Sequence, residues 1–194
     1  MRVPTAFNKR LEIRGASVGG VSFTEEGIVV SLRWRRRKYA CLCGEKTQAS
    51  YDRTLRRWRH LGFGSTRSYL EAEIVRIDSG ACRRVRTEEV SWARPGSRHT
   101  RDFQAVICYL TQRADKTTIC RPPRVSFEAV PRIVQSYVAE QLEDTRLEHL
   151  YRIGVDEVSY RKGHRYLTVV ADRDRSGAVV WVKEGRDAAT LSSF

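Results

Sequence analysis

The sequence has 194 residues, enough to bury a hydrophobic core in one large domain or in two to three small ones. Its formal net charge of +13 indicates an anionic partner, with nucleic acid as the first candidate. GC-rich coding is the alternative explanation of this charge, because arginines far outnumber lysines. The sequence has no run of about 18 apolar residues, and residues 1–13 lack the features of a signal peptide. We therefore expect no membrane partner and a cytoplasmic protein whose five cysteines are metal ligands or core residues rather than disulfides.

Residues 1–93 are predicted to form short strands and turns. The segments "GIVVSLRW" (27–34) and "SYLEAEIVRI" (68–77) are rich in β-branched and aromatic residues and alternate in part. Residues 33–59 form the most basic block, with ten positive and two negative side chains and four aromatic residues among them. This pattern suits phosphate contact combined with aromatic stacking, whereas a small β domain with a tryptophan core is the alternative. We expect Trp58 to lie in the core and the arginines of this block to face phosphates.

Three cysteines raise the question of a zinc site. A zinc ribbon holds its metal with two Cys-x-x-Cys turns, because four thiolates must meet in a tetrahedron. In "ACLCGEK" only one residue separates Cys41 from Cys43, and in "DSGACRR" Ser79 occupies the position of the expected partner of Cys82. A serine hydroxyl is a weak zinc ligand beside thiolates. The sequence therefore favours a zinc-ribbon-like fold with a degenerate site, whose Zn²⁺ is lost or weakened, over an intact site.

Residues 94–150 change to a helical period. Thr100 is predicted to cap a helix whose first turn contains Asp102 and whose apolar face is formed by Phe103, Val106, Ile107 and Leu110. A second helix is predicted from Ser126, lined by Val130, Ile133, Val134, Tyr137, Val138 and Leu142. Two such helices suggest a helix-turn-helix, although many small helical domains share this pattern. Pro131 lies either inside the second helix, where it removes a hydrogen bond, or at its first position.

One further cysteine and two histidines are considered as core residues or as metal ligands. Cys108 lies near the apolar face of the first predicted helix and is expected to be a small core residue. His60 and His99 are conceivable substitute metal ligands, but their spacing gives no support for that role.

Residues 151–194 return to a period of two. Three strands are predicted, at 153–159, 165–172 and 178–184. Their short links indicate an antiparallel meander, after which a helix begins. Without helices to cover this sheet, we expect poor burial of Val155, Val169, Val170, Val180 and Trp181.

Two adjacent acids interrupt the first strand of this meander. Alternation directs Asp156 and Glu157 to opposite faces, so they are not expected to act together. Asp156 is either a functional carboxylate or a strand-edge acid that pairs with Arg161 or Arg165.

Several long runs of the sequence carry a family resemblance. They are "TAFNKRLEI", "VSFTEEGIVVSL", "RRWRHLGFG", "VSWARPGSRHTRDF", "RIGVDEVSYRKGHRYLTVVADRD" and "VVWVKEGRD". Together they resemble the N-terminal part of bacterial insertion-sequence transposases of the ISL-three family, over essentially the whole chain. The resemblance implies an α+β multidomain protein. Residues 1–93 would be a β-rich, zinc-finger-like DNA-binding domain and residues 94–150 a helix-turn-helix. Residues 151–194 would supply the first antiparallel strands of a ribonuclease-H-like α/β domain.

The resemblance also implies a catalytic chemistry. In this family an Asp-Asp-Glu triad binds two Mg²⁺ ions, because hard divalent ions prefer oxygen ligands. Asp156 matches the first carboxylate of that triad. The other two would lie beyond Phe194, so we expect the chain to be truncated and inactive as a nuclease. Four other acids lie at the strand ends and turns and do not replace them: Asp172, Asp174, Glu184 and Asp187.

Double-stranded DNA at the terminal inverted repeats is the partner that the resemblance implies, within a bacterial nucleoid. The candidate contacts are basic residues of the first block, the helical region and the meander: Arg35, Arg36, Arg37, Arg56, Arg57, Arg59, Arg124, Arg132, Arg161 and Lys162. An oligomer with a full-length transposase is compatible with this interpretation. The alternatives are a stand-alone DNA-binding module that inhibits a full-length transposase, and a decayed copy without function.

Overall fold

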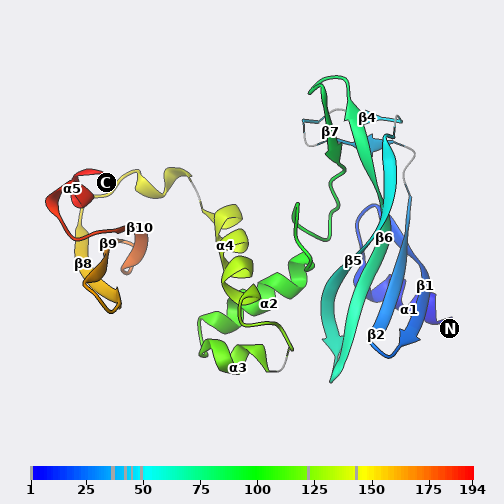
Figure 1. Cartoon of the computed structure of the whole chain (residues 1–194), viewed down its shortest axis with the longest axis horizontal. Coiled ribbons are helices and arrows are strands. Elements are labelled where there is room, and N and C mark those ends of the chain that lie inside the picture. Colours follow the sequence, from blue (N-terminus) through cyan, green and yellow to red (C-terminus); the bar gives the residue numbers. More distant parts are fainter. Residues whose placement is uncertain are drawn as a thin grey trace. The chain divides into compact units, whose positions relative to one another are not determined.

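The computed structural model describes residues 2–35, 38–41, 43–44, 46–48, 50–121, 123–142 and 144–194. The chain is mixed α+β and divides into two compact units, residues 1–139 and 140–194 (Figure 1). The predicted domain boundaries near 93 and 150 stay a prediction. No helix within the described residues is long and apolar enough to cross a membrane.

The first unit is built on a five-stranded sheet. Its strands are β1 (Ala16–Thr24), β2 (Gly27–Trp34), β5 (Asp52–Phe63), β6 (Thr66–Ser79) and β7 (Arg84–Thr87). The order is β1-β2-β6-β5, and β7 extends the pairing of β6; β2 and β6 run parallel and the other pairs antiparallel. The predicted strands at 27–34 and 68–77 are confirmed. The expectation of short strands was wrong for β5 and β6, which have 12 and 14 residues.

Tryptophans form the centre of the core in this unit. Trp58 is 1% exposed, and its ring lies 5.5 Å from that of Trp92 in an edge-to-face arrangement. The ring of Trp34 also lies close to Trp92, with the ring centres 5.0 Å apart in a tilted arrangement. The prediction that Trp58 lies in the core is therefore confirmed. The N-terminal helix α1 (Val3–Leu11) lies beside β1, where the Asn8 side-chain carbonyl accepts a hydrogen bond from the Val18 amide at 3.1 Å.

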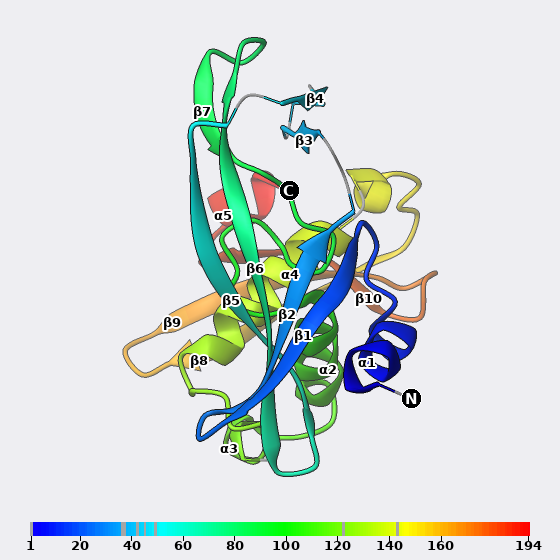
Figure 2. The same ribbon diagram turned by 90° about the vertical axis from the view of Figure 1, so that its right-hand side faces the viewer.

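A short hairpin, β3 (Tyr39–Ala40) and β4 (Lys46–Thr47), lies at one end of this sheet together with β7 (Figure 2). The same end contains the C-terminal end of β6. Chain segments some forty residues apart in sequence thus meet here, which brings the three candidate metal-binding cysteines into one region.

Three helices complete the first unit: α2 (Arg101–Thr111), α3 (Lys116–Cys120) and α4 (Ala129–Gln141). Thr100 caps α2 as predicted, since its hydroxyl accepts a hydrogen bond from the Phe103 amide. The helices enclose a second hydrophobic cluster of Phe103, Ile107, Cys108, Ile119, Val125, Val130 and Ile133.

Two details of these helices differ from the sequence-based expectation. The second helix begins at Ala129, so Pro131 lies within its first turn, where helical residues have no intrahelical amide bond to lose. On α2, Val106 is 38% exposed, and Gln104 is buried in its stead at 2%.

The second unit is a three-stranded antiparallel sheet in the order β10-β9-β8. Its elements are a 3₁₀ turn, η1 (Asp144–Leu147), then β8 (Ile153–Arg161), β9 (Arg165–Asp172), β10 (Ala178–Glu184) and α5 (Ala188–Ser192). The predicted meander is confirmed. Val155 is 47% exposed as expected, but the expectation was wrong for Val170 and Val180, which are 0% and 6% exposed. Val170 lies on the central strand β9, and Val180 lies on the edge strand β10.

Candidate functional site

Strand alternation separates two arginines of β5, Arg57 and Arg59, from its core residues, whereas Arg56 lies on the face of Trp58. Trp58 and His60 are buried, while Arg57 and Arg59 project from the opposite face. The pairing register places Arg57 opposite Glu71 and Arg59 opposite Tyr69 on β6. Cross-strand neighbours on one face interact, so both arginines have partners fixed by the register.

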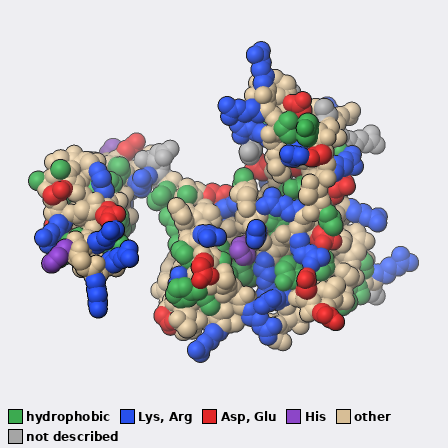
Figure 3. Space-filling view, in the orientation of Figure 1, with side chains coloured by type: hydrophobic (Ala, Val, Ile, Leu, Met, Phe, Trp, Pro, Cys, Tyr) green, Lys and Arg blue, Asp and Glu red, His purple; other side chains and the backbone are tan. Residues whose placement is uncertain are grey.

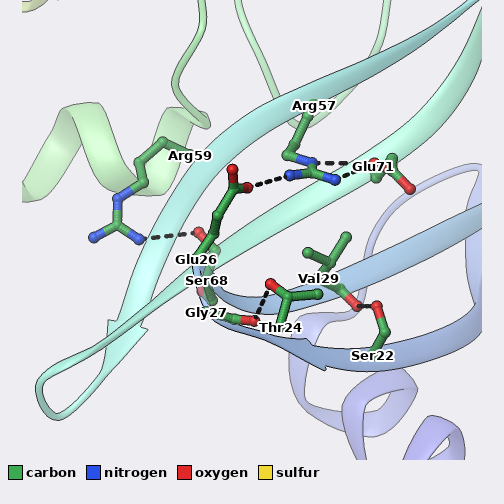
Figure 4. A network of polar contacts seen from close by, with 9 residues as sticks. All are labelled: Ser22, Thr24, Glu26, Gly27, Val29, Arg57, Arg59, Ser68 and Glu71. Atoms are coloured by element: carbon green, nitrogen blue, oxygen red, sulfur yellow. Dashed lines mark hydrogen bonds and ion pairs between the residues drawn. The ribbon is translucent and has the colours of Figure 1, made fainter.

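Arg57 lies in a network of carboxylates (Figure 4). Its Nη1 donates to Glu26 Oε2 at 2.7 Å, and its Nε and Nη2 donate to Glu71 Oε2 at 3.0 and 2.9 Å. The hydrogen bond to Glu71 is the main cause of the raised pKa of Arg57. Two carboxylates thus offset the charge of this arginine.

Arg59 joins the sheet to the helical part of the unit. Its Nη1 donates to the Ser68 carbonyl at 3.2 Å (Figure 4). Its Nη2 donates to the Pro123 carbonyl at 3.3 Å. Its guanidinium lies over the rings of Tyr69 and Phe103, at 5.3 and 5.6 Å from their centres. Burial lowers the pKa of Arg59.

The segment before α2 attaches to the free edge of β5. The Arg59 amide donates to the Arg98 carbonyl at 2.8 Å, and the Thr100 amide donates to the Arg59 carbonyl at 2.9 Å. His60 Nδ1 lies 2.9 Å from the Thr100 hydroxyl, and His99 stacks on Phe103. Both histidines are therefore placed away from the cysteines, and burial lowers the pKa of each.

A groove of about 930 Å³ lies between β5 and β6, the segment 94–99 and α4. We call it the arginine groove, because eight arginines line it: Arg56, Arg57, Arg59, Arg67, Arg94, Arg98, Arg124 and Arg132. Glu128 is the one acid among its lining residues. Figure 3 shows Lys and Arg side chains gathered where the helices adjoin the long strands. This concentration of positive charge in a concave surface favours an extended anion.

Five of the ten predicted DNA-contact residues meet in the arginine groove: Arg56, Arg57, Arg59, Arg124 and Arg132. Arg35 is exposed just after β2 and does not line it. Arg161 and Lys162 belong to the second unit, at the exposed end of β8 and in the turn after it. Arg36 and Arg37 fall outside the described residues.

The cysteine cluster consists of Cys41, Cys43 and Cys82, whose sulfur atoms all lie within 4.8 Å of one another. Ser79 completes it: its Oγ lies 3.1 Å from Cys82 Sγ and 3.5 Å from Cys43 Sγ. Cys41 Sγ lies 3.5 Å from Cys82 Sγ. The hydrogen bond between Ser79 and Cys82 lowers the pKa of Cys82, but contacts with Cys43 and Cys41 outweigh it, and the pKa is raised.

The cluster fits a tetrahedral metal ion in its donor set. Zinc–sulfur bonds of about 2.3 Å in a tetrahedron place sulfur atoms about 3.8 Å apart, close to the spacing seen here. The irregular Cys41–Cys43 spacing does not prevent the three thiols from converging, and Ser79 supplies an oxygen at the fourth position. These residues could hold a metal ion.

Asp156 lies on β8, which pairs only with β9 among the described strands. Its side chain is exposed, and its Oδ1 accepts a hydrogen bond from the Glu157 amide at 2.8 Å. Neither alternative partner is used: Arg165 lies 3.6 Å from Glu184, and no ion pair joins Asp156 to Arg161 within the described residues. Asp156 lines a shallow hollow of about 520 Å³ that also contains Arg173.

The acids near the strand ends have structural roles. Asp172 is 1% exposed and accepts hydrogen bonds from the Asp174 and Arg175 amides in the β9–β10 turn. Asp174 pairs with Arg152, and Asp187 caps α5. Across the described part of the chain, the cysteines form the one group of three or more potential metal ligands, and Asp156 is not in it.

Sequence patterns missed three arginines of the groove, Arg67, Arg94 and Arg98. They lie outside the basic block, at the start of β6 and in the segment before α2. For Arg94 and Arg98 the signal is the turn sequence "RPGSRH", whose density of arginine and small residues indicates a basic loop.

Comparisons with known proteins agree on one kind of protein. Residues 153–194 match the ISL3 family model described as a transposase. The chain is 39% identical over 155 residues to the transposase for insertion sequence element IS1557 of two Mycobacterium tuberculosis strains, covering 78% of this chain and 34% of that protein. It is 24% identical over 152 residues to the transposase for insertion sequence element IS1001 of Bordetella parapertussis, covering 78% and 37%.

The chain spans about a third of the length of these curated relatives. No solved structure matches it significantly. The family match in the second unit and the relatives, which cover 78% of the chain, agree with the sequence runs described above. Residues 153–194 thus match the ISL3 transposase family, and over 78% of its length the chain is similar to transposases of insertion sequences.

Proposed function

We propose that this chain binds double-stranded DNA at the ends of an insertion sequence, and that the arginine groove receives the DNA backbone. The observation that supports this most is the convergence of eight arginines with one acid on a single groove. Arginine is the side chain best suited to phosphate, because its planar group donates two parallel hydrogen bonds. The names of the relatives, all transposases for insertion sequences, make the DNA of such an element the expected substrate.

In this proposal the helices α2 to α4 act as a helix-turn-helix, and the sheet with the cysteine cluster acts as a zinc-ribbon-like module. The contribution of Zn²⁺ there would be structural, because it would tie the β3–β4 hairpin to the end of β6. The second unit is proposed as the first strands of a ribonuclease-H-like domain, with Asp156 as one Mg²⁺ ligand of the family's triad.

A binding assay with the full chain tests the main proposal. Fluorescence anisotropy would compare a duplex carrying the element's terminal inverted repeat with a scrambled duplex of equal length and composition. We expect tighter binding to the repeat and a steep loss of affinity with salt. Binding to neither duplex would refute the proposal.

A matched pair of charge reversals tests whether DNA binds in the arginine groove. Arg132 is exposed on α4 and lines the groove, whereas Arg121 is exposed after α3 and lies outside it. Arg132→Glu and Arg121→Glu change the net charge equally. We expect Arg132→Glu to weaken binding at least about tenfold more, since it removes a contact and adds repulsion. Equal losses would place the DNA elsewhere.

A second candidate is a DNA-end binder that acts without cutting. The observation favouring it is the isolation of Asp156, which has no further carboxylate in a metal-binding group within the described residues. Under this proposal the polypeptide of residues 1–194 binds the repeat but leaves it uncut in the presence of Mg²⁺. Strand cleavage that is lost in Asp156→Asn would refute it.

A further inference from the structure

We propose that the eight arginines of the groove divide by function into two sets. Arg67, Arg98, Arg124 and Arg132 make the phosphate contacts, and Arg56, Arg57, Arg59 and Arg94 hold the groove in shape. The proposal rests on the DNA binding proposed above. It assigns contact roles to Arg67 and Arg98, which are not among the predicted DNA-contact residues. It also removes that role from three arginines of the basic block, Arg56, Arg57 and Arg59.

The shaping set is recognised by its bonds within the protein. Arg57 donates to Glu26 and Glu71, and Arg59 donates to the carbonyls of Ser68 and Pro123. Arg56 donates to the Ser97 carbonyl at 2.9 Å. Arg94 is 8% exposed, donates to Gln104 and lies under the ring of Tyr137 at 5.0 Å. Moving any of these side chains toward DNA would break a bond that connects two segments of the unit.

The contact set has the opposite character. Arg67, Arg98, Arg124 and Arg132 are all exposed, and within the described residues no hydrogen bond or ion pair engages their guanidinium groups. Their donors therefore face solvent inside a concave, positive surface. A phosphate that replaces this water costs no bond within the protein.

The four contact residues come from four segments: the start of β6, the loop before α2, the turn before α4, and α4 itself. The shaping residues lie between them. The Arg59 side chain bonds to Ser68 on β6 and to Pro123 in the turn that contains Arg124. Its backbone amide donates a hydrogen bond to the Arg98 carbonyl. The shaping set thus determines the spacing at which the contact set meets the DNA backbone.

The salt dependence of binding distinguishes the two sets. Each arginine that neutralises a phosphate of duplex DNA contributes about 0.9 to the slope of log K against log salt. An arginine already offset by carboxylates releases few counter-ions. We expect Arg67→Ala, Arg98→Ala and Arg132→Ala each to flatten the slope by about 0.9. The matched control is Arg57→Ala, on the strand beside Arg67, which should leave the slope unchanged.

Arg124 allows a test that separates binding from folding. Its φ of 49° lies in the left-handed region, where glycine is more favourable than arginine. Arg124→Gly should therefore flatten the salt slope by about 0.9 while leaving the thermal midpoint equal or higher. Flattening together with a lower midpoint would overturn its assignment as a contact residue.

The outcomes are distinct. Flattening by the contact variants with an unchanged slope for Arg57→Ala supports the division. Equal flattening by all variants, or by none while the wild-type chain binds DNA, overturns the division but leaves the proposed function standing. Absence of any DNA binding by the wild-type chain overturns both.

Discussion

Replacing Ser79 by cysteine is expected to convert the cysteine cluster into a strong zinc site. Ser79 is 0% exposed, and its Oγ lies within 3.5 Å of both Cys43 and Cys82. A sulfur atom in its place would complete four thiolates around one point, which is the arrangement of structural zinc sites. The fold needs no rearrangement, because the other three sulfurs already lie within 4.8 Å of one another.

The expected gain in zinc affinity follows from the number of thiolate ligands. Structural zinc sites with four ligands bind with about 10–16 kcal/mol, or roughly 2.5–4 kcal/mol per ligand. Since a neutral hydroxyl contributes little, Ser79→Cys should tighten zinc binding by about two orders of magnitude or more. Competition with a chelator of known affinity at fixed pH measures this difference directly.

A control and a refuting result are available in the same strand. Ser68 is 2% exposed at the other end of β6, so Ser68→Cys adds a buried thiol without adding a ligand. If Ser79→Cys binds zinc no more tightly than the wild-type chain, or if Ser68→Cys tightens binding equally, the assignment of Ser79 to the fourth position is wrong.

The remaining predictions concern stability. Trp58→Ala should lower the free energy of unfolding by about 3–5 kcal/mol in urea titrations, whereas Phe23→Ala, at a position 72% exposed, should leave it almost unchanged. Thr100→Ala removes the cap of α2 and the partner of His60, and should cost about 1–2 kcal/mol. Burial lowers the pKa of His60, so the unfolded chain binds more protons below about pH 6.5; stability should be full above that pH and fall below it, and His60→Gln should flatten this dependence in thermal melts.

The sequence predicted the fold best where a repeating pattern met a clear end signal. The strands of the meander and the cap at Thr100 follow directly from alternation and turn residues. The alternating pattern of β5 was not recognised from the sequence. Its segment "DRTLRRWRHLGF" has arginines on its exposed face and therefore resembles a charged block. Propensity alone does not show that Glu26 and Glu71 are available to neutralise such a face.

The candidate site was predictable in residue type but not in arrangement. Charge density indicated Arg57 and Arg59. The ion pair of Arg57 with Glu71 depends on strand register, and the contact of Arg59 with the Pro123 carbonyl depends on a turn 64 residues later. The convergence of Ser79 with Cys41 and Cys43 likewise depends on the β3–β4 hairpin reaching the end of β6, which no local pattern specifies.

Strand β6 is a single structural member shared by both candidate sites. Arg67 lies at its beginning and Ser79 at its end, 12 residues apart, a span of about 40 Å at about 3.3 Å per residue. A strand that slips by one residue turns every side chain to the other face. A metal ion bound at Ser79 would thus stabilise the register of β6 from its far end. Tyr69 and Glu71 would then stay opposite Arg59 and Arg57, the arginines that they contact.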